Sequence, residues 1–267
     1  TGLIGDPYVG KKYGEIWGYK VDGLFRNDKE AAEYASRIDL STVASGYYTA
    51  TGAYGKGVRG GDIKYLDLNG DNIVNGGKGT LDDPGDRRVI GNSSPRYQYG
   101  ASLNFSWYGF DVSVFMQGIG RLDWYPGADN LRFWGPYCRP YATFVPKNFM
   151  SQVWSEENPD AYFPRARAYT SLNSNSGTAY YTNDRYLQNL AYCRLKNLTI
   201  GYTIPRRLTS KVGIKECRIY FSGENLATWS ALKSDFLDPE QAAADSDKKA
   251  NVYPWCKTYS IGLNLTF

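Results

Sequence analysis

The most informative absence in this sequence is histidine, which does not occur among its 267 residues. Histidine is the commonest general base at neutral pH and the commonest ligand for transition metals. Its absence excludes Ser-His-Asp, Cys-His and zincin sites within the chain. The carboxylate pairs Asp82-Asp83 and Glu156-Glu157 join neighbouring residues, whereas a glycosidase needs two carboxyls at a defined separation across a bond. The sequence therefore predicts a protein that is not an enzyme.

Long apolar runs and clustered charge are also missing. No run approaches the roughly 20 residues of a membrane-spanning helix, so residence in a membrane would require a β-barrel. The formal net charge of +4 is spread along the chain. The basic pairs Arg87-Arg88, Arg206-Arg207 and Lys248-Lys249 are typical of solvated turns. The sequence shows no basic stripe for nucleic acid.

Cysteine is scarce, and its spacing indicates no metal or redox site. The four cysteines lack any Cys-x-x-Cys spacing and are interpreted as small apolar residues, with their disulfide state open: Cys138, Cys193, Cys217 and Cys256. The chain opens Thr1-Gly2 without an initiator Met or a signal peptide. We expect a mature or processed protein, or part of a larger one.

Aromatic residues and glycine are abundant. The chain has 24 Tyr, 7 Trp, 11 Phe and 29 Gly, with a mean hydropathy of -0.51. This composition favours β-structure with long polar loops. The last nine residues alternate strictly, with Ile261, Leu263 and Leu265 on one side of an extended strand and Asn264 on the other. An apolar face of this kind could pack against either a second sheet or lipid.

Six antiparallel strands are predicted by such alternation, near residues 14–25, 97–107, 110–120, 193–204, 215–226 and 257–267. A bulge is expected near Lys196-Asn197. The connections between the strands run long, short, long, short, long. Up-and-down order therefore puts both short turns at one end of the sheet and the three long loops at the other. This asymmetry is typical of outer-membrane barrels.

The two faces of these strands differ in chemistry. We expect an outer, apolar set and an inner, polar set: Leu103, Val112, Ile200, Ile219 and Leu263 outside, and Ser102, Ser113, Ser222 and Asn264 inside. Aromatics at strand ends fit two interfacial girdles: Trp17, Tyr97, Trp107, Tyr202 and Phe267. Six strands cannot close a water-filled barrel, which needs at least eight. The sequence therefore predicts an all-β, antiparallel transmembrane barrel segment with long extracellular loops.

Several motifs, in order, resemble SusC/RagA-type TonB-dependent transporters. They are Gly61-Asp62-Ile63-Lys64-Tyr65-Leu66-Asp67-Leu68-Asn69-Gly70-Asp71, Asp86-Arg87-Arg88-Val89-Ile90-Gly91-Asn92 with Pro95, Arg194-Leu195-Lys196-Asn197-Leu198-Thr199-Ile200-Gly201-Tyr202, Gly223-Glu224-Asn225-Leu226, and the terminal strand ending in Phe267. The resemblance implies a 22-stranded barrel around an N-terminal plug. It also implies a SusD-type lipoprotein lid, energy from the TonB complex, and glycan or peptide substrates.

On this resemblance, residues 1–267 form the C-terminal portion of such a barrel in the outer membrane of a Gram-negative bacterium. The plug, the TonB-contacting segment and the N-terminal extension have no counterpart in the chain, so it could not transport a nutrient by itself. The TonB complex would act through those segments. We expect the stretches 121–192 and 227–257 to supply most contacts to the lipoprotein lid, because exposed aromatic-rich loops mark interaction sites. Strands 15–25 and 257–267 are expected to pair with barrel strands beyond this chain.

One stretch resembles the first half of a calcium loop. Oxygens of Asp67, Asn69 and Asp71 recur at alternate positions, and Ile73 offers a backbone carbonyl at the seventh position. The usual glycine is replaced by an asparagine, and a lysine stands where the closing glutamate belongs. A closing carboxylate would have to come from Asp82, Asp83 or Asp86. The sequence leaves two interpretations open: a structural calcium site, or a metal-free turn rich in Asx residues.

Aromatics in the expected loops are candidates for substrate binding. Trp124, Tyr125, Trp134, Trp154 and Trp229 could stack on sugar rings or anchor a peptide, as could Tyr137 and Trp255. Alternatively, these rings pack the loops against one another.

Three functions remain open. The first is the barrel of an energy-coupled nutrient importer, the second is a soluble β-rich carbohydrate-binding module, and the third is a passive porin. Need for detergent would separate a barrel from a soluble module.

Overall fold

A computed structural model of the chain describes residues 2–49, 57–138, 145–167, 179–234, 236–244, 253 and 255–267. The chain divides into two compact units. The sheet unit lies within Pro95–Leu122, Asn189–Ala244 and Val252–Phe267, and the loop unit lies within Thr1–Ser94, Asp123–Gln188 and Asp245–Asn251. We describe each unit by itself.

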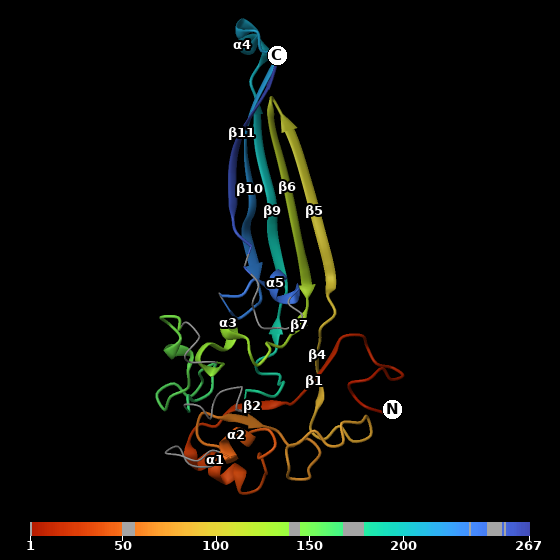
Figure 1. Ribbon diagram of the computed structural model, residues 1–267, viewed down its shortest axis with the longest axis vertical. Coiled ribbons are helices and arrows are strands. Elements are labelled where there is room, and N and C mark those ends of the chain that lie inside the picture. Colours follow the sequence, from red (N-terminus) through yellow and green to blue (C-terminus); the bar gives the residue numbers. More distant parts are fainter. Residues whose placement is uncertain are drawn as a thin grey trace. The chain divides into compact units, whose positions relative to one another are not determined.

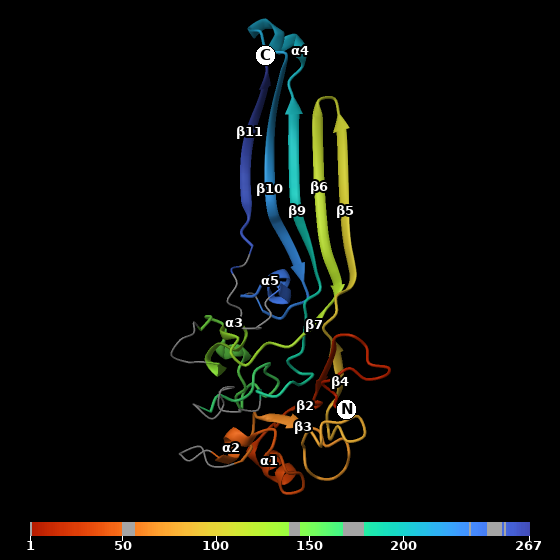
Figure 2. The same ribbon diagram turned by 45° about the vertical axis from the view of Figure 1, so that its right-hand side comes forward.

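The sheet unit is built on one five-stranded antiparallel sheet with the order β11-β10-β9-β6-β5. Its strands are long and lie side by side in both views (Figures 1 and 2). They are β5 (Arg96–Trp107), β6 (Phe110–Arg121), β9 (Tyr192–Thr203), β10 (Glu216–Ser230) and β11 (Thr258–Thr266). Their lengths of 9 to 15 residues suit strands that cross a bilayer at a tilt.

Connection lengths are segregated at the two ends of this sheet. Trp107 pairs with Phe110 across the turn at Tyr108-Gly109, and the same end carries the connection from β9 to β10. That connection contains α4 (Arg206–Thr209) and the 3-10 helix η5 (Ser210–Val212). The stretches 122–191 and 231–257 leave from the opposite end, which carries the helix α5 (Pro239–Ala244). The predicted segregation of short and long connections is confirmed for these four connections.

The register confirms the predicted faces. Leu103 pairs with Val114, Val112 pairs with Ile200, and Ile219 pairs with Leu263, so the expected apolar residues share one face. This apolar face is open, because Leu103, Ile200, Ile219 and Leu263 are all exposed. Within the described ranges, each of the other sheets has only two strands. A soluble sandwich would instead pack a second sheet of similar size against the apolar face.

The first predicted membrane strand, residues 14–25, is wrong. The chain instead forms two short strands, β1 (Glu15–Gly18) and β2 (Val21–Leu24), separated at Tyr19. They pair with β4 (Arg88–Asn92) and β3 (Ile63–Tyr65), respectively, and not with the large sheet. Tyr19 is buried and donates its backbone N–H to the Thr182 carbonyl.

The prediction fails because another segment of the chain packs against these two short strands. Alternation fixes which side chains share a face, but it does not fix what lies against that face. A Cβ on Gly18 would lie 2.7 Å from the Thr182 carbonyl oxygen, so the backbone of another segment touches this strand. Trp17 therefore belongs to the loop unit and to no membrane girdle. Of the two terminal strands expected to pair beyond the chain, only β11 lies at an edge of the large sheet.

The loop unit contains short elements around a core rich in aromatic residues. Its first helix is α1 (Asp28–Ala35), and the Asn27 side chain caps it by accepting a hydrogen bond from the Glu30 N–H. The other elements are α2 (Ser45–Thr49), β7 (Asp123–Trp124), α3 (Leu131–Trp134), the 3-10 helices η1 (Gly135–Tyr137) and η2 (Met150–Gln152), and β8 (Gln188–Asn189), which pairs with β7. Among the helices described, none is long and apolar enough to cross a membrane.

Candidate functional site

A row of small polar side chains crosses the polar face of the large sheet. Asn104 pairs with Ser113, Ser113 with Thr199, and Thr199 with Ser222, which in turn faces Ser260 on β11. The hydroxyl oxygens of Thr199 and Ser222 lie 3.3 Å apart. Ser102 and Asn264 alternate onto the same face, as predicted. The sheet thus presents a largely hydrophilic wall opposite its apolar face, with Phe115 beside Ser102 as an apolar exception.

An ion pair spans this wall above a glycine. Arg218 on β10 donates to Asp111 on β6 through Nε at 2.9 Å and through Nη2 at 2.5 Å, although β9 lies between the two strands. A Cβ on Gly201 of β9 would lie 2.5 Å from the Asp111 carboxylate. Glycine at this position therefore leaves room for the two-point contact, which is the stronger geometry for an Arg–carboxylate pair.

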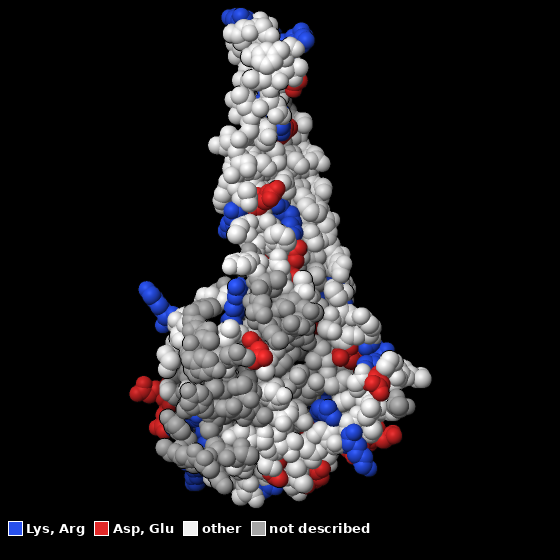
Figure 3. All heavy atoms as spheres, in the orientation of Figure 1, with Lys and Arg blue, Asp and Glu red and all other residues white. Residues whose placement is uncertain are grey.

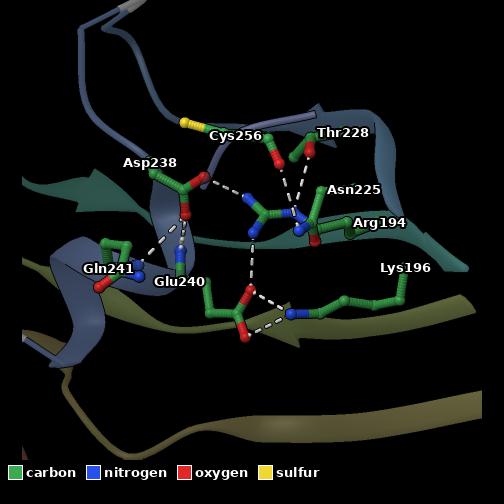
Figure 4. A network of polar contacts seen from close by, with 8 residues as sticks. All are labelled: Arg194, Lys196, Asn225, Thr228, Asp238, Glu240, Gln241 and Cys256. Carbon is green, nitrogen blue, oxygen red and sulfur yellow. Dashed lines mark hydrogen bonds and ion pairs between the residues drawn. The ribbon is translucent and has the colours of Figure 1, made fainter. Parts of the chain in front are cut away.

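A second polar cluster binds α5 to the opposite end of the wall (Figure 4). Arg194 is 1% exposed and donates to Asp238, to Glu240 Oε2 at 2.7 Å and to the Thr228 hydroxyl at 2.9 Å. Lys196 Nζ lies 2.8 Å from both oxygens of Glu240. Since a buried guanidinium without acceptors is costly, these contacts hold α5 on the polar face.

Local sequence explains this geometry. Against β6, Lys196 is the extra residue between the pairs Phe115–Asn197 and Met116–Leu195, which is the predicted bulge. Against β10, Lys196 is opposed by two residues, Asn225 and Leu226, so β10 bulges at the same level. Asn225 adopts a left-handed conformation with φ of 52°, and asparagine tolerates that region better than most residues. Asp238 accepts the backbone N–H groups of Glu240 and Gln241 and so caps α5. The bulge and the cap together bring Lys196 and Glu240 into contact.

The predicted calcium loop folds as a compact turn. The Asp67 carboxylate accepts the backbone N–H groups of Gly70 at 2.7 Å and Asn72 at 2.9 Å. Asn69 Oδ1 accepts from Asp71, and Asp71 Oδ1 accepts from Ile73. The side chains therefore turn inward onto their own backbone, as expected of an Asx-rich turn. Asn72 takes a left-handed φ of 64°.

Asp86 joins this turn but is not arranged as a closing ligand. It is buried, and its oxygens accept the N–H groups of Leu68 at 2.7 Å, Asn69 at 3.3 Å and Asn75 at 2.9 Å. Among the residues described, no three acidic or cysteine side chains gather closely enough to hold a metal ion. The hydrogen bonding therefore fits the turn better than a calcium site, and calcium stays a prediction.

Five of the seven aromatics proposed to bind substrate are buried in the loop unit. They are Trp124, Tyr125, Trp134, Tyr137 and Trp154, each less than 10% exposed. Trp134 Nε1 donates to the Gly127 carbonyl, and its ring meets Tyr186 edge-on at 5.1 Å. Burial raises the pKa of the Tyr125 hydroxyl well above its ordinary value. Burial of these rings favours the packing interpretation.

Trp229 is placed differently. It is 58% exposed. On β10 it follows Ala227 by two residues, so both lie on the same face; Ala227 pairs with Leu195 of β9, and Trp229 pairs with Cys193. Leu195 pairs with Met116, which shares the apolar face with Val114. Trp229 therefore lies on the apolar face, opposite the face of Arg194, and this position is typical of an interfacial aromatic girdle.

Two buried charged clusters are not predicted from the sequence. Arg194 stands within one of the family-like motifs, and its phase on the polar face of β9 is the only local signal of its role. The other cluster joins Asp62 to Arg167 at 2.6 Å, with the guanidinium 4.2 Å from the Tyr47 ring centroid. Burial, opposed by Arg167, raises the pKa of Asp62 to about 6. No local signal connects residues 105 positions apart.

Known proteins were compared with the chain on sequence and on structure. No family model matches it. It is 28% identical over 215 residues to TonB-dependent receptor P26 of Formosa agariphila, which covers 78% of this chain and 20% of the relative. It is 25% identical over 267 residues to TonB-dependent receptor P3 of the same organism, covering 97% of this chain and 22% of the relative. The chain thus spans about a fifth of these relatives.

Solved structures give the same picture of the fold. A structure of the RagAB peptide transporter matches 95% of this chain and 23% of its own, with a TM-score of 0.56 and 19% identity. The RagAB peptide importer in its "open-open" state matches with a TM-score of 0.52 and 18% identity. The predicted all-β antiparallel barrel class is confirmed, and the relatives are named as receptors and transporters rather than enzymes. The chain is therefore similar in sequence to about a fifth of two TonB-dependent receptors and similar in fold to part of the RagAB peptide transporter.

Proposed function

We propose that the complete receptor imports a glycan or an oligopeptide across the outer membrane of a Gram-negative bacterium. In this proposal residues 1–267 form the C-terminal portion of the barrel, and the TonB complex supplies energy through a plug that lies outside these residues. The observation that carries the proposal is the large sheet, which has an exposed apolar face for lipid and a hydrophilic face for a lumen.

The apolar face also distinguishes between the competing functions. A soluble carbohydrate-binding module would leave Leu103, Ile219 and Leu263 in water, since each is more than 40% exposed. A passive porin has the same wall as an importer, so only dependence on energy separates the two. Peptide and glycan remain alternatives, and the neighbour named as a peptide transporter favours peptide.

Uptake by cells tests the transport proposal. A strain that lacks the receptor gene should lose uptake of the fluorescently labelled nutrient, and a strain that lacks TonB should lose it equally. Labelled oligopeptides and labelled oligosaccharides are compared in parallel. Uptake that persists without TonB would show a porin instead, and a receptor recovered in the soluble fraction would overturn the barrel.

We further propose that a SusD-like lipoprotein covers the barrel mouth and contacts the stretches 121–192 and 227–257. Parts of both stretches, residues 139–144, 168–178, 235, 245–252 and 254, lie outside the described residues. The remainder carries exposed apolar side chains suited to a protein contact: Val145, Met150, Tyr180, Phe236, Tyr253 and Trp255. Substrate would be held between the lid and the lumen, with the half-exposed Trp255 beside Lys196 as a candidate for direct contact.

Copurification tests the lid. The variant Val145→Asp with Met150→Asp should reduce recovery of the lipoprotein with the tagged receptor from native outer membranes. The matched control is Leu68→Asp with Ile73→Asp, which adds the same charge at exposed apolar positions outside these stretches. Equal recovery with both variants would overturn this assignment of the lid surface and leave the barrel proposal intact.

A further inference from the structure

The connection between β9 and β10 is a folded turn rather than an extended loop. After Pro205 the chain forms α4 and η5, and Gly213 ends the turn in a left-handed conformation with φ of 75°. Thr209 is buried, and its carbonyl accepts the Ile214 N–H at 3.2 Å. The turn therefore has a fixed inward side and presents its remaining side chains outward.

Those outward side chains are mostly basic. Arg206, Arg207, Lys211 and Lys215 are all exposed, and Glu216 is the one acidic residue in 205–216. Figure 3 shows Lys and Arg side chains at the end of the sheet where α4 lies. In the part of the chain that the structure describes, none of these four cations pairs with a carboxylate. We name residues 205–215 the basic turn.

Two apolar side chains project from the same turn. Leu208 is 59% exposed and Val212 is 71% exposed, four residues apart on consecutive helical turns. Both side chains therefore extend from the turn into solvent in the absence of a bilayer. A solvated turn needs no such pair, whereas basic residues mixed with apolar ones are typical of segments that lie in a membrane interface.

The position of the basic turn along the sheet determines its expected depth in the bilayer. Trp107 and Tyr108 occupy the neighbouring turn, and the Phe110 ring lies 4.5 Å from the Tyr202 ring on the apolar face. Aromatics in such a band lie at the membrane–water interface. Arg206 follows Tyr202 by four residues, which is at most about 13 Å of extended chain. The cations therefore lie just beyond the aromatic band, at the depth of lipid headgroups.

We propose that the basic turn binds the phosphates of anionic phospholipid headgroups in the leaflet that borders the short-turn end of the sheet. This rests on the proposed function, which makes that leaflet the periplasmic one. Arg206, Arg207, Lys211 and Lys215 supply the charge, and Leu208 and Val212 enter the acyl-chain boundary. The turn thereby fixes the depth of β9 and β10 in the bilayer.

Native mass spectrometry of the complete receptor tests this site. The receptor is extracted into a mild detergent and titrated with phosphatidylglycerol or, separately, with zwitterionic phosphatidylcholine. The variant removes four charges as Arg206→Gln, Arg207→Gln, Lys211→Gln and Lys215→Gln. The matched control removes four charges at exposed positions of the loop unit, as Arg26→Gln, Lys29→Gln, Arg37→Gln and Lys78→Gln.

We expect phosphatidylglycerol to bind the turn variant about tenfold or more weakly than the wild type, since each basic residue near an anionic surface contributes several-fold. The control variant should bind phosphatidylglycerol as the wild type does, and phosphatidylcholine should bind all three proteins equally. Added salt should weaken the wild-type interaction.

Three results would overturn the proposal. The first is equal binding of phosphatidylglycerol to the turn variant and the wild type. The second is a preference of the basic turn for lipid A, which would place it in the other leaflet. The third is capture of a poly-glutamate peptide in preference to phosphatidylglycerol, which would indicate an acidic protein partner. Failure of the transport proposal would appear instead as uptake without TonB, whatever the lipid measurement shows.

Discussion

The sheet unit and the loop unit use the same residue types in opposite ways. In the sheet unit, apolar and aromatic side chains such as Leu103, Ile261 and Trp229 point away from the protein, and the polar side chains face one another. In the loop unit, aromatic side chains such as Trp134 and Tyr186 are completely buried. One unit is thus organised for lipid as its solvent, and the other for water.

The two units also differ in how they hold some of their charges, although Arg194 in the sheet unit is buried as well. The sheet unit places Arg218 and Asp111 on its hydrophilic wall, where both side chains keep part of their exposure. The loop unit encloses Asp62 and Arg167 completely. A partly exposed pair contributes little to stability, whereas breaking a buried pair leaves an uncompensated charge. We therefore expect substitutions to have their largest effects in the core of the loop unit.

The largest effect should follow from emptying that core. Trp134→Ala removes a fully buried ring that contacts Phe133 and Tyr186, and it should lower the free energy of unfolding by about 3–5 kcal/mol. Limited proteolysis of the complete receptor in increasing urea measures the loss. Trp255→Ala removes a half-exposed ring that stacks on Lys196 and should cost less than about 1 kcal/mol. Equal losses would mean that the aromatic core of the loop unit is not closed.

Breaking the buried ion pair should have a similar effect, and one that depends on pH. Arg167→Met leaves the Asp62 carboxylate buried without its cation, at a cost of about 3–5 kcal/mol at pH 8. The pKa of Asp62 is already raised to about 6 and rises further without Arg167. Protonation removes the charge, so the loss should shrink as pH falls from 8 to 5.

Arg165→Met provides the matched control, because Arg165 pairs with Asp28 where both side chains are partly exposed. Its cost should stay below about 1 kcal/mol at either pH. The free energy of unfolding of the wild type should change with pH in the same direction as that of Arg167→Met. Since the pKa of Asp62 is higher in the folded state than in the unfolded one, the wild-type free energy of unfolding should fall as pH rises from about 4 to about 6. Asp62→Asn should remove that slope.

How much of this the sequence could predict depends on the distance over which each feature is determined. The two faces of β5, β6, β9, β10 and β11 follow from a period of two, which is local, and the prediction is confirmed. The strand expected at 14–25 shows the same period, but its coverage by Thr182 and Ile90 is set by the tertiary fold. The burial of Trp134 likewise depends on Tyr186, 52 positions along the chain (186 − 134).

For the candidate site as well, contacts between residues close in sequence are predictable and contacts between distant residues are not. The Asx-rich turn at Asp67 is one of the two interpretations that the sequence offers, because its donors and acceptors lie within five residues of one another. The cluster at Arg194 was not, because its acceptors Asp238 and Glu240 come from the next long connection. Pairing of charges across long connections leaves no periodic signal in the sequence.

A single charge on either face of the large sheet sharpens the comparison within one unit. Ile200→Arg puts a cation on the apolar face and should destabilise the folded barrel by about 2–4 kcal/mol if the residue lies near the bilayer midplane. The neighbouring Thr199→Arg puts the same cation on the polar face beside Ser222 and should cost less than about 1 kcal/mol. Urea unfolding in lipid vesicles, followed by the shift of the folded band on gels, measures both. Equal destabilisation would contradict the assignment of the faces.

The smallest effect should come from the Asp67 turn, which is local and solvated in contrast to the buried core. Asp67→Ala removes two accepted hydrogen bonds, from Gly70 and Asn72, and should cost about 1–2 kcal/mol of local stability. Hydrogen exchange at residues 68–75 reports this directly.

If the turn is held only by its own backbone, the protection of the wild type is the same with 1 mM calcium as with a chelator. We expect that outcome, because the Asp86 oxygens already accept three N–H groups. Protection that rises with calcium in the wild type and not in Asp71→Ala would instead establish the calcium site that the spacing of Asp67, Asn69 and Asp71 suggested.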